Sequence, residues 1–311
     1  MGADRISEEK IKFSLLIIGG SSFLGAHLLQ RLSRLYQVHV TSFRNSIPTG
    51  IWHLASGINL DITDKREANT IVNSINPAVI IHTAANTNLH DCEENPATAQ
   101  ALNVGGTKNL ATAAKEVGAR FIYLSTDSVF DGSQGFYSEA DQPQPINVYG
   151  QTKLEGEKVV STHLSDYVIL RIALLYGWSL TASTSFTEDI VYNLSKGKTI
   201  NAFTDEYRNP LHVLNLCEII EEIIQTKTIK GLLHLAGSQR VNRYEQALKV
   251  AEIFGLDKSL ISPITTDEIK SLTYKRPKDC SMNTEKLRSV ITTPIWTLEE
   301  GLMQMYHTWL R

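Results

Sequence analysis

The sequence predicts an α/β fold with a doubly wound parallel sheet and a smaller C-terminal lobe. Short apolar runs typical of buried parallel strands alternate with helical patterns through the first half of the chain. The first apolar run leads directly into a glycine- and serine-rich turn and then a helical pattern. After about residue 177 the alternation weakens, which indicates a separate region.

The predicted strands and helices of the first half alternate in chain order. The strands are residues 13–19, 38–42, 78–82, 120–125 and 167–171. The helices between them are residues 23–32, 65–74, 97–117 and 148–161. Strands that alternate with helices form βαβ units, and such units build a parallel sheet with helices on both faces. The order fits a Rossmann-type nucleotide-binding fold.

The second half shows helical patterns separated by short polar pieces, at residues 186–195, 214–224, 244–254 and 298–310. We expect a Rossmann domain at 11–177, with a return segment at about 206–236. Residues 178–205 and 237–311 then form a substrate-binding lobe at the carboxyl ends of the strands, where open α/β sheets bind ligands.

Composition excludes several classes of protein. The 311 residues are 42% hydrophobic, enough for a sizeable core, and the formal net charge of −3 gives no sign of a nucleic-acid partner. Cys92, Cys217 and Cys280 form no CxxC pair, so neither a disulfide framework nor a metal site is expected. The start resembles no signal peptide, and no apolar stretch approaches the about 18 residues of a membrane span. We expect a soluble cytoplasmic protein.

A phosphate-binding loop is predicted between the first strand and its helix. Gly19 and Gly25 frame it, because glycine permits a tight turn and a close backbone approach to phosphate. The free N–H groups at the helix start then face the pyrophosphate of a dinucleotide. The expected cofactor-binding residues of this loop are Gly19, Ser21, Ser22, Phe23, Leu24 and Gly25.

The end of the second strand favours NADP(H) over NAD. NAD-binding proteins tend to place an acidic residue there for the ribose 2′-hydroxyl. This chain has Thr41-Ser-Phe-Arg44-Asn instead, and the planar guanidinium of Arg44 suits a 2′-phosphate. NAD remains the alternative cofactor.

A catalytic constellation is predicted around Tyr149 and Lys153, which form a YxxxK motif. Residues four apart share one helix face, so the lysine can approach both the phenol and a cofactor ribose. A nearby ammonium lowers the pKa of a phenol, which makes it a better general acid for a ketone. Thr126, at the end of an earlier strand, can donate a hydrogen bond to the substrate carbonyl.

These motifs resemble the dTDP-4-dehydrorhamnose reductase family of extended short-chain dehydrogenase/reductases. The match lies in Ser125-Thr-Asp-Ser-Val-Phe-Asp-Gly132, Pro145-Ile-Asn-Val-Tyr-Gly-Gln-Thr-Lys-Leu-Glu-Gly156, His82-Thr-Ala-Ala-Asn-Thr87, Asn103 and Arg276-Pro277. Ser22 stands where the family loop has its middle glycine.

The resemblance implies reduction of the 4-keto group of a nucleotide-linked deoxysugar. Thr126 would orient the ketone beside Asp127, Tyr149 would protonate its oxygen, and Lys153 would tune Tyr149 and bind the nicotinamide ribose. It also implies that Ala84 and Ala85 line the cofactor ribose and that Asp61 and Ile62 contact adenine. By their chemistry, Arg208 and Arg276 are candidates to hold the substrate diphosphate.

Two departures from the family keep alternatives open. Ser128 and Leu174 stand where the family often has aromatic residues. Residues 172–177 look closer to a sister group, the regulatory β subunit of methionine adenosyltransferase, which binds NADP as a partner subunit. A sugar-nucleotide epimerase or dehydratase is a third reading, although Ser128 cannot act as the second acid of a dehydratase. The sugar, the nucleotide and a homodimeric state stay open.

Overall fold

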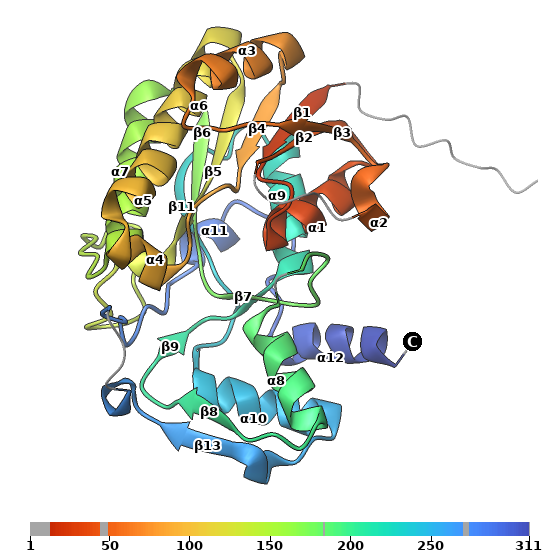
Figure 1. Ribbon diagram of the computed structural model, residues 1–311, viewed down its shortest axis with the longest axis vertical. Coiled ribbons are helices and arrows are strands. Elements are labelled where there is room, and N and C mark those ends of the chain that lie inside the picture. Colours follow the sequence, from red (N-terminus) through yellow and green to blue (C-terminus); the bar gives the residue numbers. More distant parts are fainter. Residues whose placement is uncertain (1–12, 44–48, 183, 270–273, 311) are drawn as a thin grey trace, which may run out of the picture.

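A computed structural model describes residues 13–43, 49–182, 184–269 and 274–310. A seven-stranded sheet forms its centre, in the order β11-β6-β5-β4-β1-β2-β3 with every neighbouring pair parallel (Figure 1). The predicted doubly wound parallel sheet is confirmed. The strands are β1 Ser14–Ile18, β2 Gln37–Ser42, β3 Ser56–Asn59, β4 Val79–His82, β5 Arg120–Thr126, β6 Tyr167–Ile172 and β11 Gly231–Leu235.

Helices cover both faces of the sheet (Figure 1). Apolar side chains of the strands alternate between two buried clusters, one on each face, as expected for residues that point to opposite sides of a strand. One face is packed by α1 Phe23–Leu32, α2 Thr49–Trp52, α9 Val213–Gln225 and α11 Glu285–Arg288. The other face is packed by α3 Lys65–Ile75, α6 Thr107–Val117 and α7 Val148–His163, with the short helices α4 Leu89–Glu94 and α5 Pro96–Gln100 beside α7.

The smaller lobe has its own apolar core (Figure 1). Three helices surround it: α8 Phe186–Ser195, α10 Arg243–Phe254 and α12 Leu298–Trp309. Three two-stranded sheets accompany them: β7 Leu175–Tyr176 with β10 Leu211–His212, β9 Tyr207–Arg208 with β12 Val241–Asn242, and β8 Ile200–Phe203 with β13 Ile261–Ile264. These strands were not predicted, because two to four residues are too few to show a period. Between two passages through the lobe, the chain returns to the sheet and adds β11 beside β6.

The predicted single helix at 97–117 is interrupted. A π-helical segment, Ala101–Gly106, separates α5 from α6. Within it the Asn103 side chain accepts a hydrogen bond from Asn86 N (2.8 Å) and donates to the Asn86 carbonyl oxygen (3.1 Å). It also donates to the Thr152 hydroxyl (3.0 Å). Such local widening of a helix is frequent at functional sites. Here it ties the loop after β4 to α7.

Two further sequence expectations concern the membrane and the cysteines. In the part of the chain that the structure describes, no helix combines the length and apolarity needed to cross a bilayer. Cys92, Cys217 and Cys280 are buried free thiols.

Candidate active site

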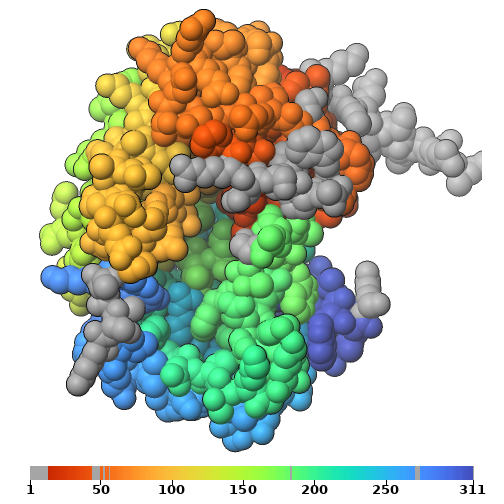
Figure 2. Space-filling view, viewed as in Figure 1, coloured from red at the N-terminus to blue at the C-terminus, as the bar shows by residue number. Residues whose placement is uncertain are grey.

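The structure gathers the predicted site residues at one edge of the sheet. Gly19 follows β1, Asp61 follows β3, Ala84 follows β4, and Thr126 ends β5. In a parallel sheet the carboxyl ends of neighbouring strands lie at the same edge, which is where ligands bind. The surface is hollowed between the sheet region and the lobe (Figure 2).

The glycine loop is packed too tightly for side chains at its two outer glycines. Gly19 has a φ of +93°, and a Cβ there would lie 2.9 Å from the backbone N of Ala84. A Cβ on Gly25 would lie 2.2 Å from the carbonyl oxygen of Gly19. The loop therefore folds back against both α1 and the segment after β4, as a phosphate-binding turn requires.

Ser22, which replaces the middle glycine of the family loop, is the N-cap of α1. Its Oγ accepts from Gly25 N (3.0 Å) and donates to the Gly19 carbonyl (2.7 Å). The hydroxyl of Thr83 lies 3.2 Å away. The serine side chain is thus used inside the loop, and the N–H groups of Phe23 and Leu24 stay at the helix start, where an α-helix offers them no acceptor.

The other predicted cofactor residues border this loop. Ala84 lies against Gly19, with Ala85 next in the chain. The Asp61 carboxylate accepts from the N–H and hydroxyl of Thr63 (2.9 and 2.7 Å), and Ile62 is buried against α6. Arg44, the residue predicted to meet a 2′-phosphate, lies outside the described residues.

The first turn of α7 carries Tyr149. Asn147 caps this helix by accepting from Gly150 N at 2.8 Å, and Thr152 donates to the Tyr149 carbonyl at 2.9 Å. At the end of β5, Thr126 accepts from Ser128 N at 3.1 Å, and its hydroxyl lies near the phenol. The structure therefore places the Thr126 hydroxyl beside Tyr149, and Lys153 lies one turn after Tyr149 on the same helix.

The electrostatics of the pair differ from the sequence expectation. Burial raises the pKa of Tyr149 above its usual value, and the Thr126 hydroxyl only partly opposes this shift. Burial also lowers the pKa of Lys153 to about 7, against an opposing effect of Glu157. The Lys153 Nζ lies 4.1 Å from the ring centroid of Tyr123. The expected lowering of the phenol pKa by the ammonium is not seen here.

Arg208 is buried and already engaged. Its Nε lies 3.1 Å from the Asp127 carboxylate, and its terminal nitrogens donate to the carbonyl oxygens of Tyr207 (2.7 Å), Lys278 (3.2 Å) and Pro277 (3.0 Å). Its predicted role in holding a diphosphate remains a prediction. These bonds show that Arg208 also joins Asp127 to the lobe.

Arg276 shares a buried carboxylate with a residue that the sequence analysis missed. Arg276 pairs with both oxygens of Glu206, which is fully buried. Arg243 approaches the same carboxylate (Nε to Oε2, 3.4 Å) and lies over the ring of Phe186. Its Nη1 is buried and has no hydrogen-bond partner among the described residues. Arg243 is the first residue of α10, where the helix dipole disfavours a cation. This unfavourable position was the feature of the sequence that could have indicated Arg243 as a functional residue.

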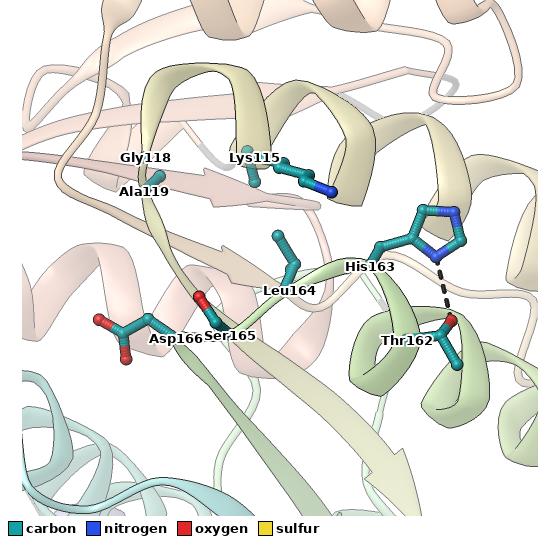
Figure 3. A pocket seen from close by; sticks show the side chains of 9 residues that line it. Lys115, Gly118, Ala119, Thr162, His163, Leu164, Ser165 and Asp166 are labelled. Atoms are coloured by element: carbon teal, nitrogen blue, oxygen red, sulfur yellow. Dashed lines mark hydrogen bonds between the residues drawn. The ribbon is translucent and has the colours of Figure 1, made fainter.

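A hollow of about 330 Å³ lies at the opposite edge of the sheet (Figure 3). It is bordered by Lys115, Ala119, His163, Ser165 and Asp166, at the C-terminal ends of α6 and α7. Figure 3 shows the hydrogen bond between Thr162 and His163 at its rim. Helix C-termini disfavour anions, so this hollow does not suit a dinucleotide.

The parallel sheet, the glycine loop after β1 and the Tyr-Lys pair on α7 define the class of extended short-chain dehydrogenase/reductases. Comparison with known proteins identifies the family within that class. The chain belongs to the family described as the RmlD substrate binding domain, whose model matches residues 13–310. The predicted resemblance to dTDP-4-dehydrorhamnose reductases is confirmed.

Individual relatives include reductases and a regulatory subunit. The chain is similar to a dTDP-4-dehydrorhamnose reductase from Bacillus anthracis, solved with NADP, with a TM-score of 0.85, 27% identity and coverage of 96% of this chain and 100% of that one. It is 32% identical over 239 residues to methionine adenosyltransferase 2 subunit beta of Rattus norvegicus, covering 74% of this chain and 70% of the relative. It is 29% identical to a probable low-salt glycan biosynthesis reductase of Haloferax volcanii, covering 92% and 95%.

Proposed function

We propose that this chain is an NADPH-dependent reductase of the 4-keto group of a nucleotide-linked deoxysugar. One observation supports this most directly: the Thr126 hydroxyl at the end of β5 lies against the Tyr149 phenol, and Lys153 follows one turn later on α7. The similarity to a dTDP-4-dehydrorhamnose reductase solved with NADP supports the same cofactor and the same kind of substrate.

The residues present fit a dinucleotide. The glycine loop leads into the N-terminus of α1, where free N–H groups suit a phosphate, and the apolar Ala84 and Ala85 suit a ribose. β2 ends at Ser42, and neither Ser42 nor Phe43 after it is an acid that could bind a 2′-hydroxyl. NADPH is therefore our first choice and NAD the alternative. When bound, the cofactor supplies a hydride to the carbonyl carbon of the substrate.

The chain's own residues would orient and protonate the oxygen of that carbonyl. Thr126 donates a hydrogen bond that orients the ketone, and the Tyr149 hydroxyl transfers its proton to the oxygen as the alcohol forms. Because burial raises the pKa of this hydroxyl, Tyr149 is held as the protonated acid that reduction needs. The Lys153 ammonium then stabilises the phenolate left behind.

Arginines at the lobe side of the site are proposed to hold the diphosphate. The contacts favour Arg243 over the two predicted arginines, since the Nη1 of Arg243 has no hydrogen-bond partner among the described residues while Arg208 and Arg276 are already paired. Charge-assisted bonds to phosphate are among the stronger polar contacts.

The test is turnover of NADPH with a panel of nucleotide-linked 4-keto sugars. Tyr149→Phe keeps the ring and removes the proton donor, so turnover should fall by about 10²- to 10⁴-fold. NADPH affinity, measured by calorimetry, should stay nearly unchanged. Normal turnover by the Tyr149→Phe variant would show that the phenol is not the acid.

A regulatory role is the second candidate. It is favoured by the 32% identity to methionine adenosyltransferase 2 subunit beta and by Ser128 and Leu174 at the expected substrate positions. This reading predicts NADPH binding, no turnover with any keto sugar, and a stoichiometric complex with a larger enzyme in a pull-down. An epimerase or dehydratase would instead interconvert or dehydrate the sugar without net consumption of NADPH.

A further inference from the structure

Lys153 lies in a buried environment, and the described part of the chain places no free carboxylate beside it. The residue is 3% exposed. Glu157, one turn further along α7, is the nearest acid on its own helix, and it raises the pKa of Lys153 only partly. Both oxygens of Glu157 are already bonded: Oε1 to Ser125 (2.5 Å) and Arg171 Nε (3.0 Å), and Oε2 to Arg171 Nη2 (2.8 Å). Most of its charge is therefore balanced by Arg171.

The group that faces the Lys153 ammonium is the aromatic ring of Tyr123 on β5. The Nζ lies 4.1 Å from the ring centroid, and Tyr123 is fully buried. The ring is held close to α7 by Gly156, since a Cβ there would lie 2.2 Å from the Tyr123 Oη. The Oη itself has no hydrogen-bond partner in the described part of the chain. The ring face is thus the part of Tyr123 that lies against the ammonium.

The other titratable neighbours offer little compensation. His82 on β4 lies 5.5 Å from the Tyr123 ring, and burial lowers its pKa to about 3, so it is neutral. Tyr149 lies on the same face of α7 and is protonated, because burial raises its pKa. Arg171 on β6 is a cation paired with Glu157. The negative face of an aromatic ring attracts a cation most strongly where both are removed from water.

We infer that Tyr123 is a positioning residue for Lys153, holding the ammonium in its charged form through a cation–π contact. The inference rests on the proposed function in one respect only, which is that the charged Lys153 stabilises the Tyr149 phenolate. The contact itself exists in the free protein, so it can be tested without substrate and without turnover.

The test replaces the ring in graded steps. In Tyr123→Phe the ring face remains, and in Tyr123→Leu it is lost. Incorporating 3,4,5-trifluorophenylalanine at position 123 keeps the ring shape but weakens its negative face. The titration of Lys153 is followed by NMR of protein labelled with ¹³Cε-lysine, and the signal is assigned with Lys153→Arg.

We expect Tyr123→Phe to titrate as the unchanged protein does. The trifluorinated variant and Tyr123→Leu should titrate lower by about 0.4 to 1.5 pH units, the shift that corresponds to a cation–π contact. If Tyr123→Leu does not fold, the trifluorinated variant decides, because its volume is close to that of phenylalanine. An unchanged Lys153 titration in the folded trifluorinated variant would overturn the inference, whether or not the protein proves to be a reductase.

Discussion

Two buried charged clusters adjoin Thr126 along the chain, one through Ser125 and the other through Asp127, and they are built differently. The first, which we call the scaffold cluster, comprises Ser125, Glu157, Arg171 and His234. It contains one carboxylate and one guanidinium. The neutral ring of His234 completes it, 3.4 Å from Arg171 Nη1 and 3.0 Å from the Tyr137 carbonyl.

The second, which we call the lobe cluster, has more cations than anions. Two carboxylates, Asp127 and Glu206, face three guanidinium groups, Arg208, Arg243 and Arg276. Burial and the neighbouring arginines together lower the pKa of Arg243 to about 10. A buried donor without a partner is costly unless a ligand supplies the acceptor.

From this difference in charge balance we predict a structural role for the scaffold cluster and a binding role for the lobe cluster. In the scaffold cluster every charge has its partner, so the cluster can fix the end of β5 and the middle of α7 without any ligand. In the lobe cluster an additional anion would balance the third arginine. The three predictions that follow test this contrast.

The largest effect is expected from Arg171→Met. The substitution leaves the buried Glu157 carboxylate without its counterion, and breaking such a pair costs about 3–5 kcal/mol of unfolding free energy. Urea unfolding measures it. The double variant Arg171→Met/Glu157→Leu should recover most of the loss, because it removes both charges. Equal losses in the single and double variants would contradict a paired cluster.

A smaller effect, on binding instead of stability, is expected from Arg243→Met. Glu206 keeps Arg276, so the unfolding free energy should change by no more than about 1 kcal/mol. The KM for a nucleotide-linked keto sugar should rise about 10- to 100-fold, as expected for the loss of a charged hydrogen bond. NADPH affinity should not change.

The matched control for Arg243 is Arg240→Met. Arg240 also lies in the lobe, but it is paired with Asp279 at 2.7 Å and is more exposed. Its loss should leave KM nearly unaltered. A similar rise in KM for both variants would mean that Arg243 has no special place in substrate binding.

The last effect is confined to acid and concerns the scaffold cluster. Burial lowers the pKa of His234 to about 4, below the value of about 6.5 for a free histidine. Between these two values the unfolded chain binds more protons than the folded one, so stability falls as pH falls from about 6.5 to 4. The contribution is at most about 1.4 kcal/mol per pH unit.

His234→Gln should flatten this part of the stability profile, because an amide does not titrate. Urea unfolding at several pH values compares the two proteins. His82 and His212, whose pKa values burial also lowers to about 3, remain in both proteins and cancel in the comparison. Parallel profiles for the two proteins would show that His234 has no part in acid sensitivity.

Most of the fold could be predicted because its elements have strong local patterns. Strands β1, β2, β4, β5 and β6 stand out as short apolar runs, and helices α1, α3, α6 and α7 show a helical period. The glycine loop and the Tyr149–Lys153 pair are short motifs. Each depends on residues close together in the chain.

The rest of the site depends on contacts between distant residues. Glu206, Arg243 and Arg276 come from three separate segments of the chain. No local pattern indicates that the two arginines share the Glu206 carboxylate. Nor could the sequence show that the Lys153 ammonium lies over Tyr123, since a strand and a helix must first pack together. Burial, which sets the pKa of Tyr149, is likewise a property of the whole fold.

The position of β11 has a consequence for the chain as it emerges from the ribosome. β6 is complete at Ile172, but its outer neighbour β11 ends only at Leu235, roughly sixty residues later. At a synthesis rate of about 5–20 residues per second, the outer edge of β6 therefore stays unpaired for several seconds before β11 is made. An unpaired apolar strand edge can pair with other chains. The nascent protein thus has a vulnerable interval between the two strands, in which a chaperone that covers strand edges would be of most use.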